Sequence, residues 1–256
     1  IITLSCFLII GCSEKDEWVD EYSSLIRECK LGREISLPLK IPNGLAYDGK
    51  YVWSADYNNK RPGNIIAIDI NSGIIKHSVS ILEHMEGLTW DGRNFWVGAP
   101  AKKISKLAEN SLRIVKTINS PTGEDADGLA WDGKYLWIAS HFHGRRGAQI
   151  IKMDVDSKKI LNEFNLPFKE VGDITYMDGY IWGIKFCLSD KPEEKPYIFK
   201  MDTDFGEIVR LYHTKELPRK MWGLTQINGK LWLSNEKEKE TSVIKIIEVL
   251  FHKDEK

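Results

Sequence analysis

The sequence predicts an all-β fold, a five-bladed β-propeller closed by an N-terminal strand. Three observations predict it: a segment that recurs five times, a Trp nine residues into every copy, and a tight-turn signal between the two. The copies open 43, 41, 45 and 50 residues apart, at Gly44, Gly87, Gly128, Asp173 and Gly223. Four short strands per period of about 45 residues, with a recurrent Trp, are typical of propeller blades.

The chain begins with an apolar run, residues 1–11, that is too short to span a bilayer as a helix. It ends in a small residue before Cys12 and then turns polar, as the apolar region of a secretory signal does. The signal lacks an initiator Met and a basic region, so we expect its start to precede Ile1. Residues 1–11 are therefore interpreted as a signal peptide remnant.

The stretch Ile9-Ile10-Gly11-Cys12 also resembles a bacterial lipobox. The resemblance implies cleavage before Cys12 and a lipid on its thiol. It would anchor the protein to a membrane surface of the bacterial cell envelope, the outer membrane in a Gram-negative cell. A plain signal peptide with a chance Cys is the alternative.

The periodicity of residues 16–30 predicts a short amphipathic helix that packs on the main body. Its apolar face is formed by Trp18, Tyr22, Leu25, Ile26 and Cys29. Gly32 stands where a glycine would end the helix. We therefore expect a lipidated N-terminus and helix over 12–32, the propeller over 33–249, and a charged tail over 250–256.

Each repeat places a turn signal before its Trp. The signal is Asp-Gly in four copies and Asn-Gly in the fifth, and such turns favour hairpins because they need positive φ. The turn lies one residue later in the last two copies, so we expect a different hairpin there. Five tryptophans in register predict core packing rather than ligand binding: Trp53, Trp96, Trp137, Trp182 and Trp232.

After its Trp, each repeat continues with a third apolar run, and in most copies a turn and a fourth run come next. The turn at 202–206 has the Asp-x-Asp-x-Gly spacing of a calcium loop. Its counterparts after Asp69 and Asp154 occupy the same place in their repeats, and Asp, Asn and Gly are ordinary turn residues. We therefore expect turns here and no metal.

The fifth copy ends after its third strand, and residues 34–39 have the pattern of an unattached fourth strand. We expect these residues to complete the blade of Trp232 as its outermost strand. This arrangement closes the ring, removes exposed sheet edges and leaves no material for a sixth blade.

Long, variable loops follow the second strand in four of the repeats, over 56–64, 141–148, 185–196 and 235–241. One face of the ring should therefore carry these loops and the mouth of the central channel. The residues just before each inner strand should surround that mouth: Asn43, Glu86, Asp127, Gly172 with Asp173, and Trp222. The candidate ligand-binding residues are Asn43, Asp127, Trp222, Lys185 and His141.

An acidic centre with one Trp suits a small ligand with an ammonium group, because carboxylates pair with it and the Trp face adds a cation–π attraction. A water-filled channel with a generic polar lining is the alternative. His141 and His143, with His84 and Glu86, could bind zinc, but nothing in the spacing specifies a third ligand. We expect no metal and no cofactor.

The charge balance bears on which kinds of partner the protein binds. With 36 Lys and Arg against 37 Asp and Glu, the net charge of −1 gives no argument for nucleic acid. We expect a monomer that binds a small molecule, a peptide or a protein at the channel mouth.

The repeats over 34–249 resemble the Trp-rich YVTN-type propeller repeats, and their plan is similar to that of the five-bladed glutamine cyclotransferases. The stretch 84–88, His-Met-Glu-Gly-Leu, matches that family's motif of Glu before Gly in the second blade. Trp222-Gly223-Leu224-Thr225 resembles a further stretch of the family, though in a later blade. The family's Phe-Thr-Gln-Gly-Leu opening is replaced by 41–45, and its Ser-Asp-Gly signature is absent.

This resemblance implies a glutaminyl-peptide cyclotransferase-like acyl transfer that releases ammonia, with Glu86 as the proton shuttle. The other class of function is that of a lipid-anchored binding module, which holds its ligand or partner on the loop face. The binding module ranks first, because a propeller fold by itself does not specify an activity.

Cys29 and Cys187 would remain in an exported protein, which favours a disulfide. Strand polarity, however, places Cys29 near the short-turn face and Cys187 on the loop face, roughly 20 Å apart. A disulfide needs Cα atoms within about 7 Å. We therefore predict no Cys29–Cys187 bond, and a lipid at Cys12 that tethers the short-turn side.

Overall fold

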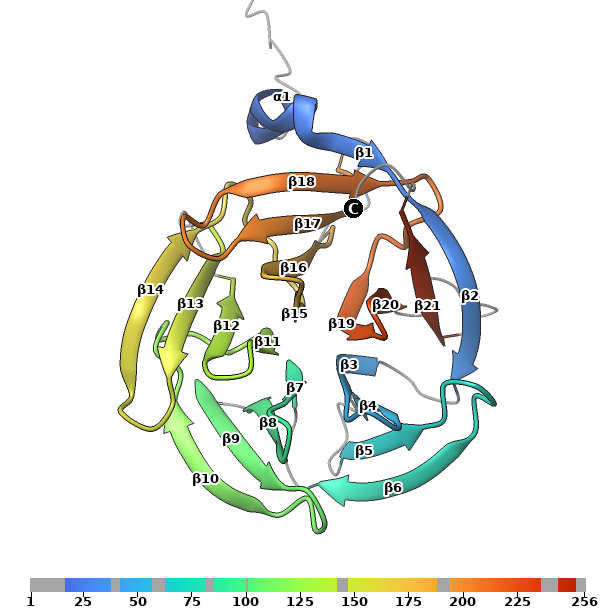
Figure 1. Cartoon of the computed structure of the whole chain (residues 1–256), viewed down its shortest axis with the longest axis vertical. Helices are drawn as coiled ribbons and strands as arrows, with labels where there is room; N and C mark the ends of the chain where they lie inside the picture. The colour runs from blue at the N-terminus through green and yellow to red at the C-terminus, as the bar shows by residue number, and fades with distance from the viewer. Residues whose placement is uncertain are drawn as a thin grey trace, which may run out of the picture.

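The computed structural model describes residues 17–37, 42–56, 63–81, 85–99, 101–141, 147–187, 194–235 and 244–251. Five sheets surround a central axis, which confirms the five-bladed propeller (Figure 1). The sequence features interpreted as a signal and a lipidated Cys12 lie outside the described residues. No helix among the described residues is long and apolar enough to cross a membrane.

Each blade is built on four antiparallel strands, ordered outward from the axis. Blade 1 holds β3 (Pro42–Tyr47), β4 (Val52–Asp56), β5 (Gly63–Ile68) and β6 (Ile75–Ile81). Blade 2 holds β7 (Leu88–Trp90), β8 (Asn94–Ala99), β9 (Lys103–Ala108) and β10 (Ile114–Asn119). Blade 3 holds β11 (Gly128–Trp131), β12 (Leu136–Ser140), β13 (Gln149–Asp154) and β14 (Lys159–Asn165). Blade 4 holds β15 (Ile174–Met177), β16 (Tyr180–Lys185), β17 (Tyr197–Asp202) and β18 (Ile208–His213). Blade 5 holds β19 (Met221–Ile227), β20 (Lys230–Asn235), β21 (Ile244–Leu250) and β2 (Lys30–Leu37).

The N-terminal strand closes the ring, as predicted. β2 runs antiparallel to β21 and is the outermost strand of the blade that contains Trp232 (Figure 1). The strand begins at Lys30, earlier than the predicted 34–39, and residues 38 and 39 lie outside the described part of the chain.

The helix is shorter than the predicted 16–30. α1 (Glu17–Tyr22) and the single 3₁₀ turn η1 (Ser23–Leu25) are followed by β1 (Ile26–Glu28), which pairs parallel with β18 and gives blade 4 a fifth strand. The edge of β18 offers backbone partners to residues 26–28, and this tertiary pairing overrides the helical periodicity. Trp18 still packs on the body, against Phe168 and Tyr197.

The turn aspartates of blades 1–3 fasten the hairpin and the Trp together. In blade 3, one oxygen of Asp132 accepts the N–H groups of Lys134 and Tyr135, and the other accepts the indole N–H of Trp137 at 2.9 Å. The same bonds form in blades 1 and 2. In blades 4 and 5, Asp178 and Asn228 instead adopt positive φ of 53° and 52°, which confirms the different hairpin.

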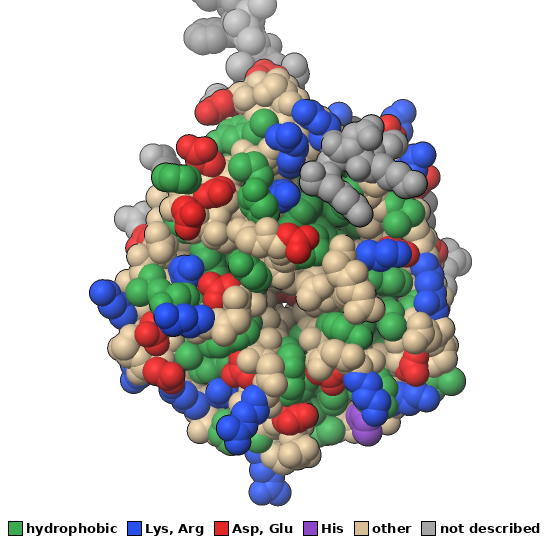
Figure 2. Space-filling view, viewed as in Figure 1, with side chains coloured by type: hydrophobic (Ala, Val, Ile, Leu, Met, Phe, Trp, Pro, Cys, Tyr) green, Lys and Arg blue, Asp and Glu red, His purple; other side chains and the backbone are tan. Residues whose placement is uncertain are grey.

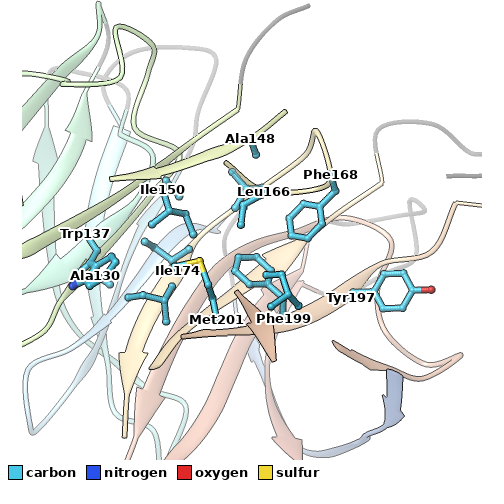
Figure 3. Close-up of a cluster of buried hydrophobic side chains, with 14 of the residues drawn as sticks. Ala130, Trp137, Ala148, Ile150, Leu166, Phe168, Ile174, Tyr197, Phe199 and Met201 are labelled. Atoms are coloured by element: carbon cyan, nitrogen blue, oxygen red, sulfur yellow. The ribbon is translucent and has the colours of Figure 1, made fainter. Parts of the chain in front are cut away.

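The closing tryptophans are all buried between blades, as predicted. The cluster between blades 3 and 4 shows the packing: Trp137 and Ile150 of one blade lie against Met201 and Phe199 of the next (Figure 3). The predicted turns are confirmed too, because the carboxylates of Asp69, Asp154 and Asp202 each accept two backbone N–H groups of their own turn.

Cys29 and Cys187 are buried and form no disulfide, as predicted. The prediction placed Cys29 from the direction of the closing strand in blade 5 alone. In the structure, its N–H donates to the carbonyl of His213 at the end of β18, while its neighbour Lys30 pairs with Leu250 in blade 5. Cys29 therefore lies at the junction between blades 4 and 5.

Candidate functional site

Every inner strand begins with a β-bulge beside the axis. In blade 2, the Glu86 N–H donates to the Gly98 carbonyl, and the Gly98 N–H donates to the Gly87 carbonyl. Two residues of the inner strand, Glu86 and Gly87, therefore lie opposite a single residue of β8. The other four blades are irregular at the same point. Bulges re-aim side chains, and here they present one residue of each pair to the loop face and the other to the axis. The pairs are Asn43-Gly44, Glu86-Gly87, Asp127-Gly128, Gly172-Asp173 and Trp222-Gly223.

The second residue of each pair is glycine except in blade 4, where it is Asp173. Asp173 is completely buried, and its carboxylate accepts four backbone N–H groups from four blades. The donors are Leu45 at 3.0 Å, Leu129 at 3.2 Å, Ile174 at 3.0 Å and Leu224 at 3.0 Å. Burial raises the pKa of Asp173 well above its usual range, while these N–H groups act in the opposite direction. We call Asp173 the hub carboxylate, because it joins the inner strands of four blades at the axis.

The glycines around the hub are required by space. A Cβ on Gly128 would lie 2.6 Å from the Gly172 oxygen and 2.8 Å from the Asp173 Cα. A Cβ on Gly44 would lie 2.5 Å from the Glu86 oxygen, and Gly44 also has a φ of +61°. The inner strands therefore approach one another so closely that the ring has room for a single side chain, that of Asp173, among the second residues of the bulge pairs. Sequence analysis placed Asp173 at the mouth, and the structure places it at the hub.

The first residues of the pairs form a small cavity on the loop face. Asn43, Glu86, Asp127 and Trp222 line it together, at a volume of about 50 Å³, which is the convergence that the sequence predicted. Its wall also includes Phe186, whose ring lies 5.1 Å from that of Trp222. We call it the mouth cavity. A second cavity of about 70 Å³ lies beyond the hub, and a small opening remains at the centre of the ring in Figure 2.

Asp127 is the most strongly perturbed acid of the mouth cavity. Burial and, to a smaller extent, the charge of neighbouring Glu86 raise its pKa to about 6, against the opposing effect of His141. The His141 Nδ1 lies 2.8 Å from an Asp127 oxygen, which also accepts the His141 backbone N–H at 2.8 Å. This hydrogen bond raises the pKa of His141 in turn. The cavity thus combines two carboxyl groups, and a histidine behind it stabilises the charged form of one, Asp127.

The remaining predicted residues do not line the mouth cavity. Lys185 is buried, and its Nζ donates to the carbonyl of Lys195 at 3.3 Å. His141 reaches the cavity only through Asp127. His84 and His143, considered for zinc, lie outside the described residues, and the described residues contain no group of His, Cys, Asp and Glu suited to a metal.

Sequence reasoning missed Phe186 and the separate role of Asp173. Phe186 is one apolar residue in an apolar stretch, so nothing in the pattern distinguishes it. Asp173 did carry a signal, because it stands where the other four repeats have glycine.

No family model matches the chain, and no curated protein matches it. Solved structures do match. A glutaminyl cyclase from Myxococcus xanthus superposes with a TM-score of 0.68 at 12% identity, over 88% of this chain and 97% of that one. The likeness is one of fold. The hydrazine synthase of Kuenenia stuttgartiensis matches with a TM-score of 0.50 at 14% identity, over 87% of this chain and 66% of that one.

Proposed function

We propose that the mouth cavity binds the ammonium group of a small ligand or of a peptide N-terminus. The observation that carries this proposal is the pairing of Glu86 and Asp127 in one cavity with an aromatic wall of Trp222 and Phe186. No Lys or Arg is among the residues that line it in the described part of the chain. Two carboxyl groups beside an aromatic face are a suitable environment for an organic cation.

The size of the mouth cavity supports the same reading. About 50 Å³ exceeds the roughly 30 Å³ that one water molecule occupies in the liquid, and is comparable to an ammonium group with its first carbon. The rest of the ligand would then lie outside, on the loop face. Such a ligand would be recognised by its amine, and its body would contact residues that vary more freely.

The test is calorimetric titration with the tripeptide amide Gln-Phe-Ala-NH₂ and with its N-acetylated form. We expect the free amine to bind, and acetylation or Glu86→Gln to weaken binding by about tenfold or more, since a charged hydrogen bond contributes about 1.5–3 kcal/mol. Glu124→Gln is the matched control, because Glu124 pairs with Lys102 and does not line the cavity. Equal binding of the two peptides would refute an amine site.

Binding of the amine should weaken in acid. Because the pKa of Asp127 is raised to about 6, its carboxyl is ionised at pH 7 and largely protonated at pH 5, where affinity should fall about tenfold. His141 is hydrogen-bonded to Asp127, so these two groups titrate as a coupled pair. Titrations from pH 5 to 7.5 should show the step in the wild type and lose it in Asp127→Asn. A step of the same size in Asp127→Asn would assign it to another group.

The second candidate function is an ammonia-releasing cyclisation of N-terminal glutamine. The neutral-range pKa of Asp127 favours it, because a carboxyl group of this kind can exchange protons at pH 7, and the fold is shared with a glutaminyl cyclase. In this reaction the α-amine nitrogen attacks the side-chain amide carbon. The new C–N bond forms as the C–NH₂ bond breaks, and Glu86 carries a proton from the amine to the leaving ammonia. The mouth cavity must widen to admit a glutaminyl side chain, so this reading ranks second.

Ammonia release from Gln-Phe-Ala-NH₂ separates the two functions. If the protein is a cyclase, release should be lost in Glu86→Gln by about a hundredfold or more and retained in Glu124→Gln. Binding without ammonia release would leave the amine-binding function alone. Release that is unchanged in Glu86→Gln would exclude the proton shuttle.

We also propose that a lipid on Cys12 holds the protein at the surface of an envelope membrane. The support is the apolar run that ends in Ile9-Ile10-Gly11-Cys12. Expression of the full-length protein in bacteria with an alkyne-tagged fatty acid should label the wild type and not Cys12→Ser, and Cys12→Ser should leave the membrane fraction. Equal labelling of both would remove the proposal.

A further inference from the structure

A larger cavity lies between blades 2 and 3, away from the axis. It has a volume of about 480 Å³, within the range of 300–1,000 Å³ of ligand pockets. We call it the inter-blade cavity. Its lining comes from the segment after β10 and from the facing ends of β13 and β14: Pro121, Thr122, Gly147, Gln149, Ile151, Glu163 and Asn165.

The repeat structure shows what this position holds elsewhere. Ser120 and Leu166 make equivalent backbone bonds, to Lys102 and Ala148, so Thr122 and Phe168 occupy matching places two residues later in successive blades. The third strands of blades 3 and 4 correspond in the same way. Gln149, the first residue of β13, therefore matches Tyr197, the first residue of β17.

Between blades 3 and 4 the matching space is apolar and filled. Trp18 of α1 lies there, with its ring centroid 5.4 Å from that of Phe168 and 5.6 Å from that of Tyr197 (Figure 3 shows the two receiving rings). Between blades 2 and 3, Thr122 and Gln149 replace the two rings, and the space is a cavity. One groove of the ring thus receives a side chain of the chain itself, and the next groove is polar and open.

The polar groups of the inter-blade cavity form a partly satisfied array. Gln149 is only 7% exposed, and its amide nitrogen donates to Glu163 and, at 3.4 Å, to the side-chain oxygen of Asn165. These bonds orient the Gln149 oxygen, the Asn165 amide nitrogen and a second Glu163 oxygen as further acceptors and donors. The lining therefore offers both donors and acceptors, with one carboxylate and no lysine or arginine among its described residues.

We propose that the inter-blade cavity is a second binding site, and that its ligand is a neutral polyhydroxylated molecule, a saccharide. The amide groups can donate to and accept from neighbouring hydroxyls, and the carboxylate accepts from them, while a hydroxyl is a donor and an acceptor at once. The lone carboxylate disfavours anions. The site is separate from the mouth cavity, and its occupancy does not depend on the function proposed there.

Saturation-transfer NMR and calorimetry with maltose, cellobiose and N,N′-diacetylchitobiose test the proposal on the whole chain. We expect at least one of the three to bind, and Asn165→Ala and Glu163→Gln each to weaken it by about tenfold, as the loss of one hydrogen bond does. Both residues are exposed at the rim, so neither variant should disturb the fold. Lys159→Ala, on β14 but outside the cavity, is the matched control.

A second variant tests the cavity by filling it. Thr122→Phe copies the residue of the filled groove and should abolish saccharide binding, while Glu86→Gln should leave it unchanged. The proposal is overturned if none of the three saccharides binds, or if binding persists unchanged in Asn165→Ala, Glu163→Gln and Thr122→Phe. It is also overturned if putrescine binds at this site and the saccharides do not, because the site would then prefer a cation to a neutral ligand.

Discussion

Asp173→Ala is expected to lower the free energy of unfolding by about 3–5 kcal/mol, or to prevent folding at 37 °C, because it removes the hub carboxylate. Four backbone N–H groups would lose their acceptor in a buried setting, and each unsatisfied group costs about 1–3 kcal/mol. Water entering the space left by the carboxylate would recover part of this loss, which limits the effect below the sum. Urea unfolding followed by far-ultraviolet circular dichroism measures it.

Asp173→Asn distinguishes charge from shape. The amide keeps one acceptor oxygen but points an NH₂ group at N–H donors, so we expect it to destabilise nearly as much as alanine. Asp178→Asn is the matched control in the same blade, since Asp178 is exposed and Asn tolerates its positive φ. A change below about 1 kcal/mol in Asp173→Ala would show that the hub is not needed to hold the blades together.

Gly128→Ala is the second variant with a large expected effect, about 3 kcal/mol or more. Its new methyl group would meet the Gly172 oxygen at 2.6 Å and the Asp173 Cα at 2.8 Å, both parts of the backbone of the next blade. Side chains could move away, but these atoms are held in the ring, so an inner strand must shift. The shift would also disturb the bond from Leu129 to Asp173.

Gly133→Ala separates this steric effect from backbone strain. Gly133 lies in the hairpin of the same blade with a φ of +98°, and no atom lies within 4 Å of its added Cβ. Only the unfavourable φ then acts, at a cost of about 1–2 kcal/mol. Thermal melts of the two variants should therefore differ clearly in midpoint. Equal midpoints would argue against crowding at the axis.

The blade count and the ring closure could be predicted because both depend on local patterns. A Trp and a tight turn recur in each repeat, and each repeat makes its own hairpins from neighbouring residues. The closing strand was recognisable as a fourth strand without a blade. The end of the helix was not predictable from residues 16–30 alone, because the partner of β1 lies in β18, almost two hundred residues along the chain.

The candidate site was predicted in outline for a similar reason. Residues that precede equivalent strands must meet at one mouth, so Asn43, Glu86, Asp127 and Trp222 could be placed together. Which residue of each bulge pair points to the mouth and which to the axis depends on hydrogen bonds between blades. That information is not local, and it is why Asp173 was assigned to the mouth.

The pairing of β2 with β21 has a consequence for biosynthesis. These strands stand at opposite ends of the chain, so the last blade can form only after β21 has been synthesised. Bringing together segments roughly 210 residues apart costs roughly 5 kcal/mol of chain entropy, offset only when the other blades are already in place. We expect a nascent chain that stops before Ile244 to present β2 and β20 as two open edges, which are templates for aggregation. Quality control of this protein would thus depend on β21 being made.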